Sequence, residues 1–127
     1  MLVSTGLVLE EEQAVRVCAE VASVYPDRNE ALMNAGVIVL AREVSAYPGF
    51  GKVVNNPEWS VVRVSQEHGI LGCKDGAGRR VEEEFEIGQK VFLWCQHSCI
   101  TAAAFHAYYV VDEQDVVRDI WVPWKGW

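Results

Sequence analysis

The chain has 127 residues, a formal net charge of −7 and a pI near 4.9, and half of its residues are hydrophobic. This length and composition suit one domain over residues 1–127 with a modest core. The 11 basic residues form no cluster, so we expect neither nucleic acid nor an anionic membrane surface as a partner. No apolar run approaches the roughly 20 residues of a membrane span, and the chain lacks the basic start of a signal peptide.

Cysteine usage points to a reducing compartment. Four cysteines at irregular spacing do not indicate a disulfide framework: Cys18, Cys73, Cys95 and Cys99. Reduced thiols are typical of cytosolic proteins. We therefore expect a cytoplasmic location.

Most of the first half of the chain is predicted to be strand. Residues 14–25 are rich in β-branched side chains, and Pro26 stops this strand. After an Asn-Ala-Gly turn, the apolar residues 37–40 are predicted to form a buried strand. Residues 47–56 are predicted as a loop with an embedded strand. The alternation over residues 59–64 is typical of a half-buried strand.

The second half continues this pattern. Residues 74–80 indicate a solvated turn, residues 82–86 an acidic surface segment, and residues 91–95 an apolar strand. Residues 101–104 favour a short helical turn, and residues 108–112 and 116–122 are expected to pair. Short strands separated by Gly and Pro turns predict a mainly β fold, as a small barrel or a sandwich.

The segment His97-Ser98-Cys99, at the end of the predicted strand 91–95, is the main candidate site. An imidazole and a thiol two positions apart on a strand point the same way, and both are zinc ligands. Two ligands are too few for a closed structural zinc site, so open positions would remain for water or substrate, as at a catalytic metal. The alternative is a core histidine beside a buried cysteine, because a single H-x-C pattern has low specificity.

Four blocks of sequence together resemble the C-terminal part of the eukaryotic-type D-serine dehydratases. The blocks are VYPDRNEALMNAG (24–36), SQEHGIL (65–71), QHSCIT (96–101) and VRDIWVPWKGW (117–127). These enzymes use pyridoxal phosphate (PLP) and are related to D-threonine aldolase and, more distantly, to alanine racemase. The resemblance implies a β domain that normally follows a PLP-binding α/β (TIM-like) barrel, in a homodimer.

The resemblance gives the candidate ligands a function. His97 and Cys99 match the family's zinc ligands one for one, with the cysteine as thiolate and the histidine neutral. The implied reaction converts D-serine, or a similar D-hydroxy amino acid, to pyruvate and ammonia, with zinc as a Lewis acid on the β-hydroxyl. Cys95 stands where relatives usually carry proline. Strand alternation would put it on the same face, as a third ligand or a disulfide partner of Cys99.

Glu67 and His68 form a second candidate pair. One interpretation places this carboxylate and imidazole near the site, where they contact substrate or orient the metal ligands. The other is a turn that ends a strand, in which His68 caps the backbone and Gly69 supplies a positive φ.

The family's PLP lysine lies in the barrel domain, and no lysine of this chain stands in a matching motif. Residues 1–13 resemble the tail of that barrel. We therefore expect a fragment that is inactive alone, with PLP bound only in a full-length parent. Alternatives are a D-threonine aldolase-like lyase domain or a non-catalytic zinc-binding or interaction module. The tryptophans near the C-terminus, which include Trp121, Trp124 and Trp127, are expected to pack against the missing domain or a second subunit.

Overall fold

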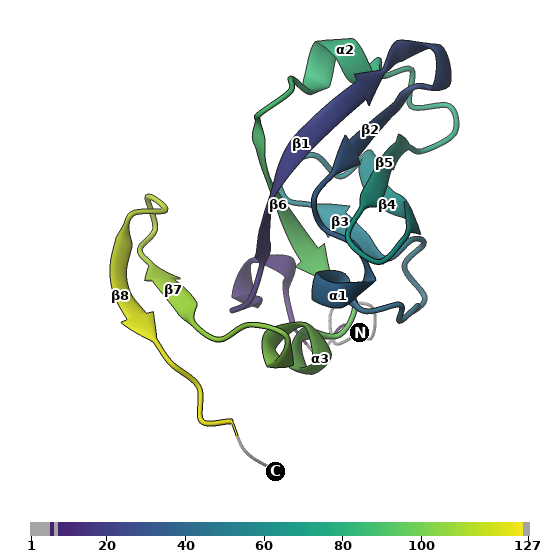
Figure 1. Ribbon diagram of the computed structural model, residues 1–127. Helices are drawn as coiled ribbons and strands as arrows, with labels where there is room; N and C mark the ends of the chain where they lie inside the picture. The colour runs from purple at the N-terminus through teal and green to yellow at the C-terminus, as the bar shows by residue number, and fades with distance from the viewer. Residues whose placement is uncertain (1–5, 7, 126–127) are drawn as a thin grey trace.

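The computed structural model describes residue 6 and residues 8–125, so the predicted barrel tail at residues 1–13 and Trp127 lie partly or wholly outside the described residues. Six of the described strands form a closed antiparallel barrel in the order β1-β2-β5-β4-β3-β6, which the pairing of β6 with β1 completes (Figure 1). This confirms the predicted mainly β barrel. The strands are β1 (Val17–Tyr25), β2 (Glu30–Met33), β3 (Gly51–Val53), β4 (Trp59–Val64), β5 (Gly69–Cys73) and β6 (Lys90–Cys95).

Short helices connect these strands, and a separate hairpin follows them. Figure 1 shows α1 and α3 together at one end of the barrel, with α2 at the other. None of the described helices is long and apolar enough to cross a membrane. The elements are η2 (Glu10–Glu12), η3 (Pro26–Arg28), α1 (Val37–Leu40), α2 (Val81–Glu84) and α3 (Ser98–Ala103), and the hairpin strands are β7 (Tyr108–Val111) and β8 (Val117–Trp121).

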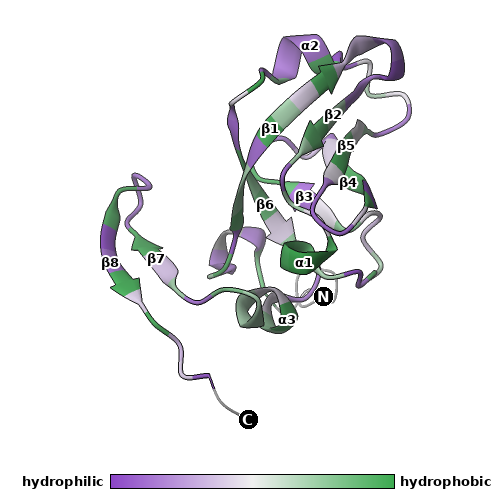
Figure 2. Cartoon of the chain, in the orientation of Figure 1, coloured by the Kyte–Doolittle hydropathy of each residue, from purple (hydrophilic) through white to green (hydrophobic). Residues whose placement is uncertain are grey.

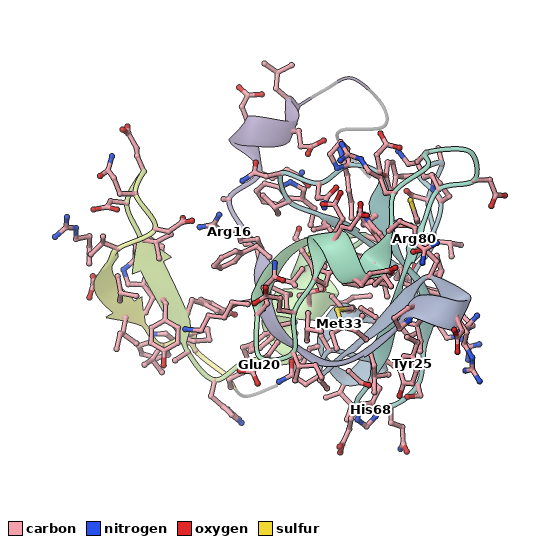
Figure 3. All side chains as sticks on the ribbon, turned by 90° about the horizontal axis from the view of Figure 1, so that it is seen from above. Arg16, Glu20, Tyr25, Met33, His68 and Arg80 are labelled. Atoms are coloured by element: carbon pink, nitrogen blue, oxygen red, sulfur yellow. The ribbon has the colours of Figure 1, made fainter. Side chains whose placement is uncertain are left out.

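The core fills the inside of the barrel. Val21, Met33 and Leu71 come from three different strands and are fully buried, and Figure 3 shows Met33 inside the ring of strands. Trp59 packs edge-on against Phe85 with ring centroids 4.9 Å apart. Each such side chain stabilises the fold by about 1.5–3 kcal/mol. The barrel is therefore a rigid base for the connections at its ends.

Residues 37–40 form the helix α1, so the prediction of a buried strand was wrong. The N–H groups of Val37 and Ile38 donate to the carbonyls of Ser65 (2.8 Å) and Gln66 (3.1 Å), and Ala41 N–H donates to Val37 O (2.9 Å). Only Leu40 of this helix is buried, while Ile38 is 56% exposed. The distant 65–66 segment accepts hydrogen bonds from the first helical N–H groups. This long-range contact overrides the preference of the β-branched residues 37–39 for a strand.

Three other elements differ in detail from the predictions. Strand β4 is confirmed, but a bulge between Val61 and Arg63 gives it three buried residues followed by exposed ones instead of strict alternation. Strand β5 was not predicted, because two glycines interrupt its short apolar run. Helix α3 begins at Ser98, three residues before the predicted helical turn.

The predicted terminal strand pair is confirmed as the β7–β8 hairpin, which stands apart from the barrel (Figure 1). The Asp112 carboxylate accepts the N–H groups of Gln114 (2.9 Å) and Val116 (3.0 Å) and pairs with Arg118. The Val116 N–H is the main reason why the pKa of Asp112 lies below its usual value. Arg16 pairs with Asp115 and lies between the barrel and the hairpin (Figure 3).

We predict that Gly36→Ala destabilises the fold by about 3 kcal/mol, because the added Cβ cannot fit. That atom would lie 2.4 Å from Ser65 O and 2.6 Å from both Gln66 O and His68 N. Gly76→Ala is the control, since its Cβ would meet nothing within 4 Å although its φ is +80°. The control should cost only about 1 kcal/mol for the left-handed backbone. Urea unfolding measures both values, and equal losses would contradict the close packing of α1 on the 65–68 loop.

Candidate metal centre

The segment that carries His97 and Cys99 connects β6 to α3. Strand β6 ends at Cys95, His97 is the N-cap of α3 with φ −140° and ψ 93°, and Cys99 lies in the first turn of the helix. The prediction that strand alternation aligns these side chains was therefore wrong, because no strand continues through them. His97 is half-buried and Cys99 is exposed.

The donor chemistry fits zinc, with coordination positions left open. An imidazole nitrogen and a thiolate sulfur are both typical zinc ligands, and they lie on either side of Ser98 at the start of α3. Among the described residues, no group of three or more His, Cys, Asp or Glu side chains is placed to hold a metal. The described part of the chain therefore supplies at most two protein ligands at this place.

Cys95 belongs to the barrel interior. It pairs with Gly51 across the β3–β6 ladder, and its side chain packs against the core cluster, as the alternation with Val91 and Leu93 requires. The shared face expected for Cys95, His97 and Cys99 is thus not formed. Cys95 and Cys99 are both free thiols, so the alternative of a disulfide between them is not formed either.

Gln96, between Cys95 and His97, was not predicted from the sequence as a site residue. Its side chain is buried, and its amide Nε2 donates to Gly49 O (2.7 Å) and to Tyr47 O (3.1 Å). Its Oε1 accepts a hydrogen bond from Ser45 Oγ (2.7 Å). One glutamine therefore joins the 45–49 loop to the connection that carries the candidate ligands.

Glu67 and His68 lie exposed in the turn between β4 and β5, and Figure 3 shows His68 at the edge of the barrel. The turn is closed by the main chain, since Ser65 N–H donates to His68 O (2.8 Å). Gly69 does not take the predicted positive φ. It is needed instead for close packing, because a Cβ there would lie 2.4 Å from Ala35 O and 2.5 Å from Met33 Cε.

Helix α1 links the two candidate places. Its N-terminus is hydrogen-bonded to the Glu67–His68 turn through Ser65 O and Gln66 O, and it also packs against α3. The turn and the start of α3 therefore share one end of the barrel (Figure 1). The two segments that carry the candidate residues thus both contact the same short helix.

Comparison with known proteins identifies the family of the chain. Residues 14–111 match the family described as "Putative serine dehydratase domain". The D-serine dehydratase of Schizosaccharomyces pombe is 45% identical over 129 residues. That alignment covers 97% of this chain but 30% of the yeast enzyme, so the chain spans about a third of the length of this relative.

Solved structures show the same domain. D-threo-3-hydroxyaspartate dehydratase from Delftia sp. HT23 superposes with a TM-score of 0.87 at 27% identity, over 99% of this chain and 36% of that one. D-threonine aldolase from Filomicrobium marinum superposes less closely, with a TM-score of 0.71 at 25% identity over 87% of this chain and 28% of that one.

Two variant structures of D-threo-3-hydroxyaspartate dehydratase are also similar, with TM-scores of 0.88 and 0.87 and 26% identity. They cover 99% of this chain and about a third of that enzyme. One variant has a histidine replaced by alanine, and the other, which is in a metal-free form, has a cysteine replaced by alanine two positions later.

The barrel fold, the long match to one family and the similarity to two dehydratases lead to the same conclusion. The chain belongs to the serine dehydratase domain family.

Proposed function

We propose that this chain is the metal-carrying C-terminal domain of a D-serine dehydratase-type enzyme, and that His97 and Cys99 hold a zinc ion. The spacing of these two residues carries the proposal. They form the one His-x-Cys pattern of this sequence, in which the cysteine follows the histidine by two positions. The replaced histidine and cysteine of the related dehydratase have the same spacing, and its cysteine variant is metal-free.

The bound zinc would supply Lewis acidity at the β-hydroxyl of a D-hydroxy amino acid such as D-serine. The half-buried imidazole of His97 would be held by the barrel, while the exposed thiolate of Cys99 would face the substrate side. Two protein ligands would leave positions for water or substrate. Glu67 and His68, at the same end of the barrel, are proposed to contact the substrate or to orient the ligands.

PLP, which acts as an electron sink for carbanions, would be held by the part of the enzyme that the relatives have in addition. The chain spans about a third of its relatives, and this is consistent with a missing PLP-binding domain. We propose that the chain does not catalyse dehydration without that domain. The complete enzyme is proposed to be a cytoplasmic homodimer, and the free state of the four cysteines is consistent with that location.

The β7–β8 hairpin supplies a surface for this missing domain. Tyr109 lies opposite Ile120, and Val111 lies opposite Val117, so the four side chains form one apolar face that is 39–71% exposed. Tyr108 Oη, on the other face, donates to Ala102 O at the end of α3 (2.8 Å). Figure 2 shows apolar stretches at both ends of β8. A two-stranded hairpin is marginal alone in water, and an exposed apolar face typically marks an interface.

A D-threonine aldolase-like lyase remains the alternative reaction. The superposition with a D-threonine aldolase has a TM-score of 0.71, against 0.87 for the hydroxyaspartate dehydratase, and it covers less of this chain. These values favour the dehydratase reaction.

We predict that the purified chain carries close to one zinc ion and that the His97→Ala, Cys99→Ala double variant carries none. Removing both donors leaves no soft ligand at the start of α3. A Cys18→Ala, His106→Ala double variant, which removes an exposed thiol and an exposed imidazole elsewhere, should keep its zinc. Elemental mass spectrometry measures the content. Equal zinc in both double variants would contradict the assignment.

We predict that Ile120→Asp abolishes association with the N-terminal two-thirds of the S. pombe relative, produced as a separate chain. A charge in the apolar face would be buried without a partner on docking, which costs several kcal/mol. Gln114→Asp puts the same charge in the exposed turn and should not affect association. Size-exclusion chromatography with light scattering measures the complex. Association of Ile120→Asp at the strength of the unmodified chain would contradict the proposed interface.

A further inference from the structure

We propose that Gln96 is a positioning residue for the metal centre, because its side-chain amide fixes the backbone from which His97 projects. This inference rests on the proposed zinc site and adds a residue that is not itself a ligand. Cys95 before it is held in the β6 ladder, while His97 after it lies outside any strand. Gln96 therefore lies between the last residue of the barrel strand β6 and the N-cap of α3.

Every hydrogen-bonding group of this amide has a partner. Gln96 is only 7% exposed, its two N–H groups reach Gly49 O and Tyr47 O, and its oxygen accepts from Ser45 Oγ. The Ser45 hydroxyl oxygen in turn accepts Tyr47 N–H (3.1 Å). A buried network with all members satisfied favours one conformation, whereas loss of the donor leaves two carbonyls unpaired.

The loop that receives these bonds is itself fixed to the barrel. Phe50 N–H donates to Val61 O (2.8 Å), and Phe50 packs against the core. Gly49 has φ +85°, and a Cβ at this residue would lie 2.7 Å from Val61 O. The C-terminal end of the 45–49 loop is therefore held against the barrel. Through its hydrogen bonds to this loop, the Gln96 amide holds the β6–α3 connection in place relative to the barrel.

The other side of His97 is fixed by α3. Thr101 N–H donates to His97 O (3.1 Å), and Thr101 is 1% exposed. His97 thus lies between the Gln96 amide on one side and a buried helical turn on the other. These contacts restrain the backbone of His97, and so the direction of its Cα–Cβ bond, before any metal binds, and such preorganisation favours binding.

The first test compares the zinc affinity of Gln96→Ala with that of the unmodified full-length chain by titration calorimetry. We expect affinity to fall about tenfold, the lower end of what loss of an orienting group costs at metal sites. Gln96→Glu keeps the shape and the Ser45 bond but places a carboxylate beside two carbonyl oxygens, so it should be at least as weak. Gln114→Ala, the same change in an exposed turn, should bind like the unmodified chain.

A second readout does not require metal. Hydrogen exchange of the Thr101 amide, followed by NMR in the metal-free chain, should be faster in Gln96→Ala, while exchange in the β1–β2 ladder stays unchanged. If Gln96→Ala does not fold, Ser45→Ala removes the bond to Gln96 Oε1 and the bond from Tyr47 N–H. It should weaken zinc binding at least about threefold, since each lost hydrogen bond makes a net contribution to the stability of the network. Val21→Ala lowers stability through a distant core cavity and should leave zinc affinity unchanged.

The outcomes separate this proposal from the zinc assignment. Weaker zinc binding together with faster Thr101 exchange supports the positioning function. Unchanged zinc affinity in Gln96→Ala, or unchanged Thr101 exchange, overturns it. If the unmodified chain binds no zinc, the zinc assignment fails for this chain, and Thr101 exchange alone then decides whether Gln96 fixes the His97 backbone.

Discussion

The pairing of β6 on both sides is the constraint on which the rest of the structure depends. Leu93 is opposite Val17 in β1 and opposite Val53 in β3, and the barrel closes only through these two ladders. A closed barrel has no free edge, so the path of β6 is fixed up to its last residue, Cys95. The chain must leave the sheet at that point. The two candidate ligands therefore have a defined place although they lie in neither a strand nor a long helix.

A second set of contacts gathers the remaining candidates at the same end. The carbonyls of Ser65 and Gln66 take up the first N–H groups of α1, and the absence of a side chain at Gly36 allows this approach. Helix α1 then packs against α3. Buried backbone groups need partners, and here that requirement joins segments about 30 residues apart into one surface. The exposed apolar face of the hairpin is typical of an interface, which is consistent with the proposed docking of a missing domain.

The sequence alone predicted the mainly β fold, as a barrel or a sandwich, and the terminal strand pair, because these depend on local composition and spacing. That His97 and Cys99 bind a metal stays a prediction. The sequence did not predict α1, since residues 37–40 have the side chains of a strand and only the contact with residues 65–66 makes them helical. The prediction that Cys95, His97 and Cys99 share one face was wrong for a related reason. The partners β1 and β3 set the length of β6, and the strand ends before His97. The hydrogen bonds of Gln96 could not be predicted from a sequence pattern, because its partners lie 47–51 positions away.

X-ray absorption at the zinc edge, recorded on the zinc-loaded chain, would identify the donor atoms around the metal. If His97 and Cys99 are ligands, we expect one sulfur at about 2.3 Å, with nitrogen or oxygen donors at about 2.0–2.2 Å. The sulfur shell should disappear in Cys99→Ala and persist in Cys95→Ala. A shell without sulfur, or a sulfur that is lost with Cys95 and kept without Cys99, would contradict the claim that His97 and Cys99 form the metal centre.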